Sequence, residues 1–557
     1  MSSFIRRPVS TSIRTIGILA FVLLIAHAPL LLNDGVFMDD WLVLKLRPDY
    51  AIDLDFLLNG AGHPVFFSYY YLANMSGAPV MVMQAMTVAA ILAGAICLLL
   101  AATRTGLLNR AEAVGFSLIV WTYPGYQMWA GKGNALYVFS FGLFFVGAWL
   151  LTLAFSARGG SHVLLRIAAA LVFFLSFALN SIMVLYAFAM LGLFVAVWRN
   201  SDQTRGPVRR LFSAAWRCLL GYPEFVVLPL IYWGALNIWF KRVGIYAGHY
   251  NVHIPTVPEL LDGWHSFFRF GYVEVLKSAI RALLDNRPLL VVAAIPIVVA
   301  LVLFFRKARR ARPSVVRIAL PLLLSVLLFF LLALPYLVAG LAPGENFYES
   351  RHLLLFGLPL ALGLLAVERA IGIVVGDRAA TLGVFGVASI LSIAVLWNGY
   401  VFMQARALKQ EALSSQLAGI SRPAATVFNL DDGFMDYPSR HLAFGVPEIT
   451  GMLRLAWGNR PFLGFTLRAE RPTILQEMEV SRTSEGSAYH HIDPSGPQGI
   501  ISLQPGPAAV SNFALMRHYY ACRLLARCDV SAFLAQLALV KVDVGPIAGL
   551  TPLERSK

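Results

Sequence analysis

Long apolar runs, separated by short polar segments, dominate the pattern of hydrophobic and polar positions along the chain. The runs recur at about 20 residues, the length that an α-helix needs to cross the hydrocarbon core of a bilayer. Eleven such runs predict eleven membrane-spanning helices, at residues 14–32, 78–102, 111–128, 134–156, 164–180, 182–198, 219–240, 289–305, 318–340, 352–367 and 381–401. The pattern therefore predicts an all-α polytopic membrane domain.

Composition and charge agree with a membrane protein and bear on its orientation. Hydrophobic residues make up 58% of the chain and charged residues only 13%, whereas a soluble domain carries about 25% charged residues. The net charge of +15 comes largely from short loops between apolar runs, a pattern that sets membrane topology and predicts no nucleic-acid partner. It places the N-terminus in the cytoplasm and, after eleven spans, the C-terminus outside. We expect a multi-pass protein of a bacterial inner (cytoplasmic) membrane.

This orientation predicts two domains. The transmembrane domain covers residues 1–402, with outer loops at 33–77, 241–288 and 341–351, and an extracytoplasmic domain covers 403–557. The second domain contains strand-like runs, a helix-like run and many turn residues, so we expect a mixed α/β fold. Cys522 and Cys528 lie there and can form a disulfide if the compartment is oxidising. Six residues apart on one continuous helix they would be too distant, so a bridge requires the helix to end between them.

The first outer loop begins with the acidic stretch NDGVFMDDW, residues 33–41. Asp39 and Asp40 are adjacent, so their side chains point in different directions. One can face a cleft as a general base or metal ligand while the other makes a structural bond. The alternative is that both acids cap a helix beginning at Trp41. Asp34 stands beside Gly35 and is interpreted as a turn residue.

The last outer loop carries the stretch YESRH, which leads into an apolar run. Arg351, with His352 beside it, could bind the phosphate of a lipid carrier, because guanidinium groups bind phosphate oxygens in pairs. The alternative is an arginine that reaches the lipid headgroups and pairs with Glu349. Tyr348 and Glu349 are candidates for a substrate cleft. His63, in the first outer loop, is either a third cleft residue or a local structural histidine.

No metal ligand is assigned from the sequence. Three histidines of the second outer loop, at 249, 253 and 265, match no compact zinc pattern. Nearly uncharged span interiors also weigh against an ion-coupled transporter, which would place ionisable groups near the middle of the bilayer.

The acidic FMDDW stretch, the aromatic interfacial segment after it and the late YESRH stretch together resemble the GT-C fold glycosyltransferases. The resemblance implies a polyprenyl-phosphate sugar as donor and a glycan, lipid or protein acceptor. It implies that Asp39 or Asp40 is the catalytic base, or in some branches joins a divalent cation (Mg or Mn), and that Arg351, with His352, lies near the donor phosphate. Many members have Asp-Glu or a spaced Asp-x-Asp pair here, so the identity of the base and the need for a metal stay open.

The expected function is therefore hexosyl or pentosyl transfer to an acceptor hydroxyl on the outer side of the membrane, in cell-envelope glycan or lipid modification. One carboxylate base acting by direct displacement predicts inversion, because retention more often uses a second carboxylate as nucleophile. The alternatives are a transporter or flippase of a lipid-linked saccharide and a polysaccharide polymerase or ligase. In each case membrane lipids surround the protein.

Overall fold

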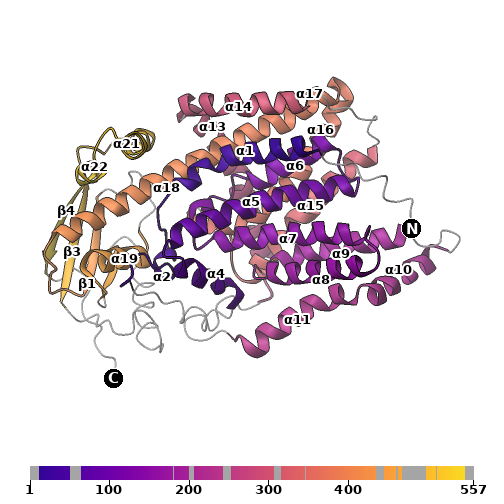
Figure 1. The fold of residues 1–557 in the computed structure, drawn as a ribbon, viewed down its shortest axis with the longest axis horizontal. Helices are drawn as coiled ribbons and strands as arrows, with labels where there is room; N and C mark the ends of the chain where they lie inside the picture. The colour runs from indigo at the N-terminus through magenta and orange to yellow at the C-terminus, as the bar shows by residue number, and fades with distance from the viewer. Residues whose placement is uncertain are drawn as a thin grey trace.

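The computed structural model is mostly helical, with one small sheet at an end of the molecule (Figure 1). It describes residues 12–50, 64–179, 181–199, 206–241, 253–285, 287–305, 315–344, 347–433, 444–459, 462–466, 497–509 and 511–545. The helices of the larger part lie roughly along the long axis of the molecule and form one apolar core.

Six helical stretches in the described residues are long and apolar enough to cross a membrane. They are α1 (Ile13–Leu31), α5 (Pro79–Arg104), α7 (Ala135–Ala154), α15 (Val315–Val338), the stretch Tyr348–Val375 and the stretch Asp377–Gly419. The fifth combines η4 (Phe347–Phe356) with α16 (Gly357–Val375), and the sixth combines α17 (Asp377–Thr381), η5 (Leu382–Gly386) and α18 (Val387–Gly419). A bent pair, α10 (Pro207–Gly221) and α11 (Pro223–Trp239), makes a seventh if it counts as one span. The prediction of a multi-pass membrane protein is confirmed at this level.

The other predicted spans correspond to shorter helices: α6 (Arg110–Trp121), α8 (Gly160–Ser176), α9 (Ile182–Arg199) and α14 (Arg287–Phe305). The largest difference concerns α6, which ends at Trp121 although the apolar run continues to residue 128. Pro124 follows shortly after, and a proline disfavours helical geometry at the residue before it. The chain then makes only a short turn, η1 (Met128–Ala130), before α7. This interruption creates the loop on which the site described below depends.

The segment predicted as the second outer loop contributes a helix that packs on the membrane helices. It consists of α12 (Val257–Phe268), η3 (Arg269–Val273) and α13 (Glu274–Asp285). A capping box of Thr256 and Glu259 starts it. The Phe267 ring stacks on Phe356, with ring centroids 4.9 Å apart, and the Ser266 hydroxyl donates a hydrogen bond of 2.5 Å to the Pro343 carbonyl. These contacts fasten the helix above η4.

The C-terminal part is a mixed α/β unit, as predicted. Its sheet has the order β2-β1-β3-β4, in which the first three strands are parallel and β4 runs antiparallel to β3. The strands are β1 (Val427–Asp432), β2 (Leu463–Thr466), β3 (Gln498–Pro505) and β4 (Ala538–Val544), and the helices are α19 (Val446–Trp457), α21 (Asn512–Leu525) and α22 (Val530–Leu537). Figure 1 shows α18 running from the membrane helices to this sheet. The helix passes unbroken through residue 402, the predicted domain boundary.

Buried ion pairs join the end of α18 to the C-terminal unit. The Arg406 guanidinium donates to Glu448 at 2.6 Å, and Lys409 donates to Asp432 at 2.8 Å. All four side chains are at most 3% exposed. Breaking a buried pair leaves an uncompensated charge and is strongly destabilising, so these pairs fix the end of α18 to the C-terminal unit.

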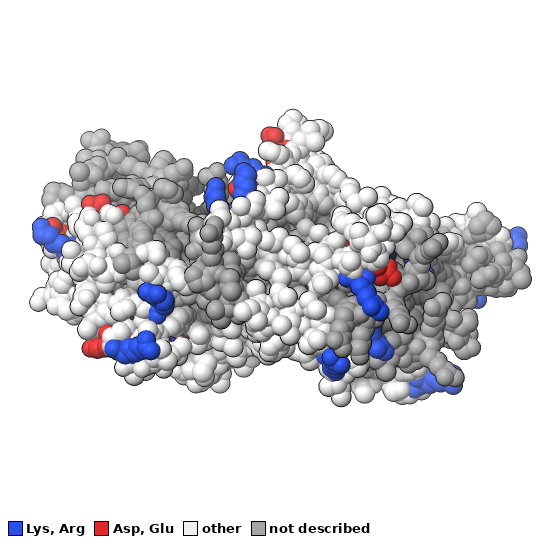
Figure 2. Space-filling model, turned by 90° about the horizontal axis from the view of Figure 1, so that it is seen from above, with Lys and Arg blue, Asp and Glu red and all other residues white. Residues whose placement is uncertain are grey.

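Charged side chains are sparse at the centre of the face drawn in Figure 2. The figure shows a white area there, without Lys, Arg, Asp or Glu, and charged side chains on both sides of it. Such a distribution is expected when the middle of the molecule faces lipid and its ends face water.

Candidate active site

The acidic loop leaves α1 and reaches a single helical turn, α2 (Asp40–Val43), within a few residues. Met38 precedes the two acids with φ of +50°, a left-handed conformation that is rare outside glycine. Asp39 occupies the N-cap position of α2, but its side chain makes no capping hydrogen bond. The capping alternative therefore does not describe Asp39.

Asp40 is buried and accepts hydrogen bonds from three backbone N–H groups. One oxygen accepts from Phe37 and from Lys132, each at 3.0 Å, and the other accepts from Gly133. A Cβ at Gly133 would lie 2.8 Å from that oxygen, so only glycine allows the approach. Asp40 thus ties the acidic loop to the loop between α6 and α7.

Lys132 completes this buried contact. Its ammonium group donates to the carbonyls of Asn33 at 2.9 Å and Gly35 at 2.7 Å. Burial raises the pKa of Asp40 to about 6, opposed by the charge of Lys132 and the backbone N–H groups. Burial lowers the pKa of Lys132 to about 8, opposed by Asp40 and Asp34. Asp40 and Lys132 together hold the acidic loop against the loop between α6 and α7.

Asp39 lies on the exposed side of the same turn. Its carboxylate accepts a hydrogen bond of 2.5 Å from the Tyr348 hydroxyl, which comes from η4, 309 positions later in the chain. The Arg351 guanidinium lies over the Tyr348 ring, 3.9 Å from its centroid, and its Nε donates to His352 at 3.3 Å. The structure therefore brings the two sequence-predicted stretches, FMDDW and YESRH, into direct contact.

The remaining predicted site residues have different surroundings. His352 is only 5% exposed and packs against the Tyr336 ring, with centroids 5.2 Å apart, so it lies beneath Arg351 rather than on the open surface. Glu349 is half-buried beside Gly344. His63 lies outside the described residues.

The C-terminal unit also holds the acidic loop. Trp41 belongs to the core of that unit, and a Cβ at Gly451 of α19 would lie 2.3 Å from its ring. Arg47 donates to the Leu455 carbonyl at 2.9 Å, and Asp34 forms an ion pair with Arg523 of α21. Asp34 is thus more than the turn residue predicted, because it pairs with an arginine of the C-terminal unit.

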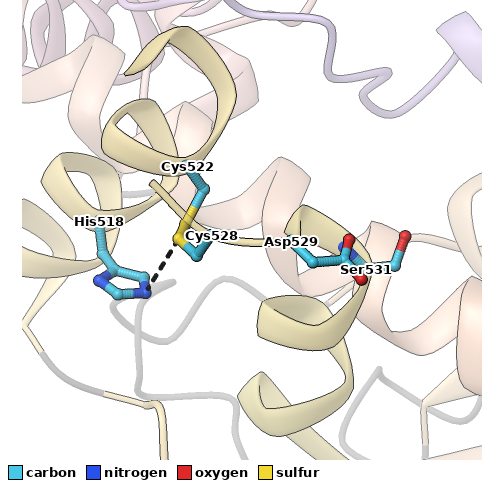
Figure 3. The surroundings of a disulfide bond; sticks show 5 residues. All are labelled: His518, Cys522, Cys528, Asp529 and Ser531. Atoms are coloured by element: carbon cyan, nitrogen blue, oxygen red, sulfur yellow. Dashed lines mark hydrogen bonds between the residues drawn. A yellow bond between two sulfur atoms is a disulfide. The ribbon is translucent and has the colours of Figure 1, made fainter. Parts of the chain in front are cut away.

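Cys522 and Cys528 form a disulfide, with Cα atoms 4.6 Å apart (Figure 3). Helix α21 ends at Leu525, between the two cysteines, and Ala526 takes a left-handed conformation that turns the chain back. The helix therefore ends between the two cysteines, as the sequence analysis required for a disulfide between them. Figure 3 shows His518 of the same helix directed toward the bridge.

The acidic pair does not fit a divalent cation shared by both carboxylates. Three N–H donors face the oxygens of Asp40, whereas Mg²⁺ or Mn²⁺ would need their lone pairs. Asp39 receives a hydroxyl hydrogen bond. No catalytic step is therefore assigned to a metal here.

Lys132 is the site residue that sequence reasoning missed. The available signal was a charged residue between two glycines, GKG at 131–133, in a short segment between apolar runs.

Comparisons with protein-family models, with curated proteins and with solved structures return no match for this chain. The fold and the site define a multi-pass membrane protein in which a small α/β unit holds an acidic loop against a tyrosine–arginine pair.

Proposed function

We propose that this protein is a membrane glycosyltransferase with a GT-C-like architecture, which moves a sugar from a polyprenyl-phosphate donor to an acceptor hydroxyl with inversion. One observation carries the proposal: Tyr348 contacts both an exposed carboxylate, that of Asp39, and a cation, that of Arg351. Attack by a hydroxyl on a phosphate-linked sugar needs a base at one end of the reaction and a phosphate-binding cation at the other.

The contacts support separate roles for the acids. Asp39 is the general base, because its carboxylate is exposed and bound by one hydroxyl donor, which an acceptor hydroxyl can displace. Asp40 is a positioning residue, because three backbone N–H groups already occupy its oxygens. Asp39 removes the acceptor proton as the hydroxyl attacks the anomeric carbon, and the bond to the donor phosphate breaks.

Arg351 stabilises the phosphate as it leaves with both bonding electrons. Tyr348 contacts both groups and sets their separation. His352 accepts from Arg351 Nε and thereby fixes the orientation of the guanidinium over the Tyr348 ring. Loss of this orientation would weaken a paired hydrogen bond to phosphate more than a simple charge attraction.

The proposed orientation has eleven spans, the N-terminus in the cytoplasm and residues 403–557 in the periplasm, with the active site at the outer membrane surface. There the acceptor can be a glycan, a lipid or a protein. The amphipathic helix from Val257 to Asp285 lies above η4 through Phe267 and Phe356, a position suited to covering the lipid part of the donor.

Ion pairs within the helical domain favour an enzyme over an ion-coupled transporter. Glu112 of α6 accepts from Arg369 at 2.7 Å, and Glu224 of α11 pairs with Arg166 at 2.6 Å. Acids that are already paired with arginine serve helix packing. An ion-coupled site would instead need carboxylates that exchange a proton or a cation.

The direct test is sugar transfer by the purified protein in lipid nanodiscs. Labelled polyprenyl-phosphate hexoses and pentoses would be supplied with a cell-envelope extract as acceptor, and product formation measured for the parent and Asp39→Asn. We expect the substitution to reduce transfer by about 10²- to 10⁴-fold, the usual contribution of a general base, without lowering thermal stability.

Asp34→Asn is the matched control, because Asp34 is an exposed acid of the same loop that pairs with Arg523. We expect it to retain nearly full activity. Transfer by Asp39→Asn at the parent rate would remove the proposed role of Asp39. Absence of transfer by the parent with every donor class would remove the proposed function.

A further inference from the structure

We propose a soft-metal site in the C-terminal unit, formed by His518, Cys522 and Cys528 when the disulfide between the cysteines is reduced. One donor atom from each residue lies within 4.8 Å of the other two. The metal class is a thiolate-preferring d¹⁰ cation such as Zn²⁺. This inference does not depend on the proposed glycosyltransfer, because none of its ligands contacts Asp39, Tyr348 or Arg351 in any hydrogen bond, ion pair or ring contact of the described residues.

Local structure places the three ligands together. His518 and Cys522 are four positions apart on α21, so they share one face of the helix. The left-handed Ala526 ends the helix, and the Arg527 amide donates to the Ala521 carbonyl at 3.3 Å. This turn brings Cys528 back over the same face, as Figure 3 shows.

The histidine is aimed at the sulfur. His518 Nε2 lies 3.8 Å from Cys528 Sγ, and its ring packs on Phe533 with centroids 4.8 Å apart. In tetrahedral coordination, zinc bonds of about 2.3 Å to sulfur and about 2.0–2.1 Å to nitrogen put these two ligand atoms about 3.6 Å apart. The nitrogen–sulfur separation is therefore already close to that of a zinc site. The two sulfurs must separate, and the distance between His518 and Cys522, which is within 4.8 Å, must adjust with them.

The chemistry balances with a dithiol reductant. The dithiol is oxidised to its own disulfide and supplies two electrons and two protons, while the Cys522–Cys528 bond breaks and each sulfur becomes a thiol. Zn²⁺ then displaces both thiol protons, because thiolates rather than thiols bind the metal. Two thiolates neutralise the ion, and water can fill the fourth position, as in three-ligand zinc sites.

The test measures Zn²⁺ binding by the full-length protein in detergent. A background with Cys97→Ser and Cys218→Ser removes the two free cysteines. The protein is kept oxidised or is reduced with dithiothreitol, which is then removed without air, and Zn²⁺ is titrated against a chromophoric chelator. We expect one ion per reduced chain and none per oxidised chain. Bound Zn²⁺ should also protect Cys522 and Cys528 from alkylation.

Two histidine variants decide whether the site has three ligands. His518→Ala should weaken Zn²⁺ binding at least about tenfold, while His265→Ala, an exposed histidine on α12, should leave it unchanged. Both variants keep the cysteines, so misfolding from a lost bridge does not complicate the result. Equal affinity of His518→Ala and the parent, or equal binding by reduced and oxidised protein, would overturn the proposal.

Discussion

Asp39 and Asp40 are neighbours in the chain, but their carboxylates lie in opposite surroundings. Asp40 is 1% exposed and is bound by three backbone N–H groups, whereas Asp39 is exposed and accepts from the Tyr348 hydroxyl. The difference arises because adjacent side chains leave a turn in different directions. The comparison teaches that Asp40 stabilises the conformation of the acidic loop, whereas the carboxylate of Asp39 stays exposed and can bind a substrate hydroxyl.

The largest effect on stability should come from Asp40→Ala. It leaves three buried N–H groups without their acceptor and leaves the exposed Asp34 as the remaining acid that acts on the buried Lys132, at a cost of about 3 to 5 kcal/mol. Chemical unfolding in detergent measures it. Asp39→Ala serves as the control and should change the free energy of unfolding by less than about 1 kcal/mol. Similar losses for the two variants would contradict the division between a structural and an available acid.

The pH dependence of stability should sharpen the same comparison. Burial raises the pKa of Asp40 from 3.8 to about 6, so the folded state holds this proton more tightly than the unfolded state. The contribution of Asp40 is therefore complete below about pH 4 and is lost as the pH rises through 6, by up to about 3 kcal/mol. Parent and Asp40→Asn unfolding, compared between pH 4 and 8, isolates this group. A free energy of unfolding of the parent that rises with pH relative to that of Asp40→Asn would contradict the assignment.

A smaller effect should follow from filling the contact between α19 and the acidic loop. Gly451→Leu drives a side chain into the Trp41 ring, and such overpacking costs about 1 to 3 kcal/mol. Hydrogen exchange of the peptide over residues 36–44 should rise, and transfer activity should fall. Gly419→Leu is the matched control, since a Cβ there meets nothing within 4 Å. If hydrogen exchange is unchanged in both variants, the contact of α19 with Trp41 does not hold the acidic loop in place, and the C-terminal unit does not position Asp39.

The smallest effect should come from the ion pair between Asp34 and Arg523. Both side chains are more than a third exposed, and exposed pairs contribute about 0 to 1 kcal/mol. Arg523→Gln should therefore shift unfolding by no more than this, and less at high salt. A larger loss in this variant would show that α21 supports the acidic loop more strongly than its exposed contact indicates.

The sequence predicted much of the fold because its signals are local. Runs of apolar residues determine which segments can cross a bilayer, and the turn-rich C-terminal region, with its strand-like runs, indicated an α/β unit. The early end of α6 was missed because the apolar run continues past Trp121, while Pro124 stops the helix. Lys132 was missed for a related reason: the loop that contains it was assigned to a helix and to a short connection.

The sequence by itself determined the class of membrane protein, the acidic and basic stretches worth examining and the condition for a Cys522–Cys528 bridge. Only the tertiary structure decided which carboxylate is available, because that depends on Lys132 and Gly133, more than 90 residues from Asp40 in the chain. It also decided that Tyr348 contacts both Asp39 and Arg351. Contacts between residues so far apart in the sequence come from helix packing and loop closure. The composition and periodicity of the sequence do not predict them.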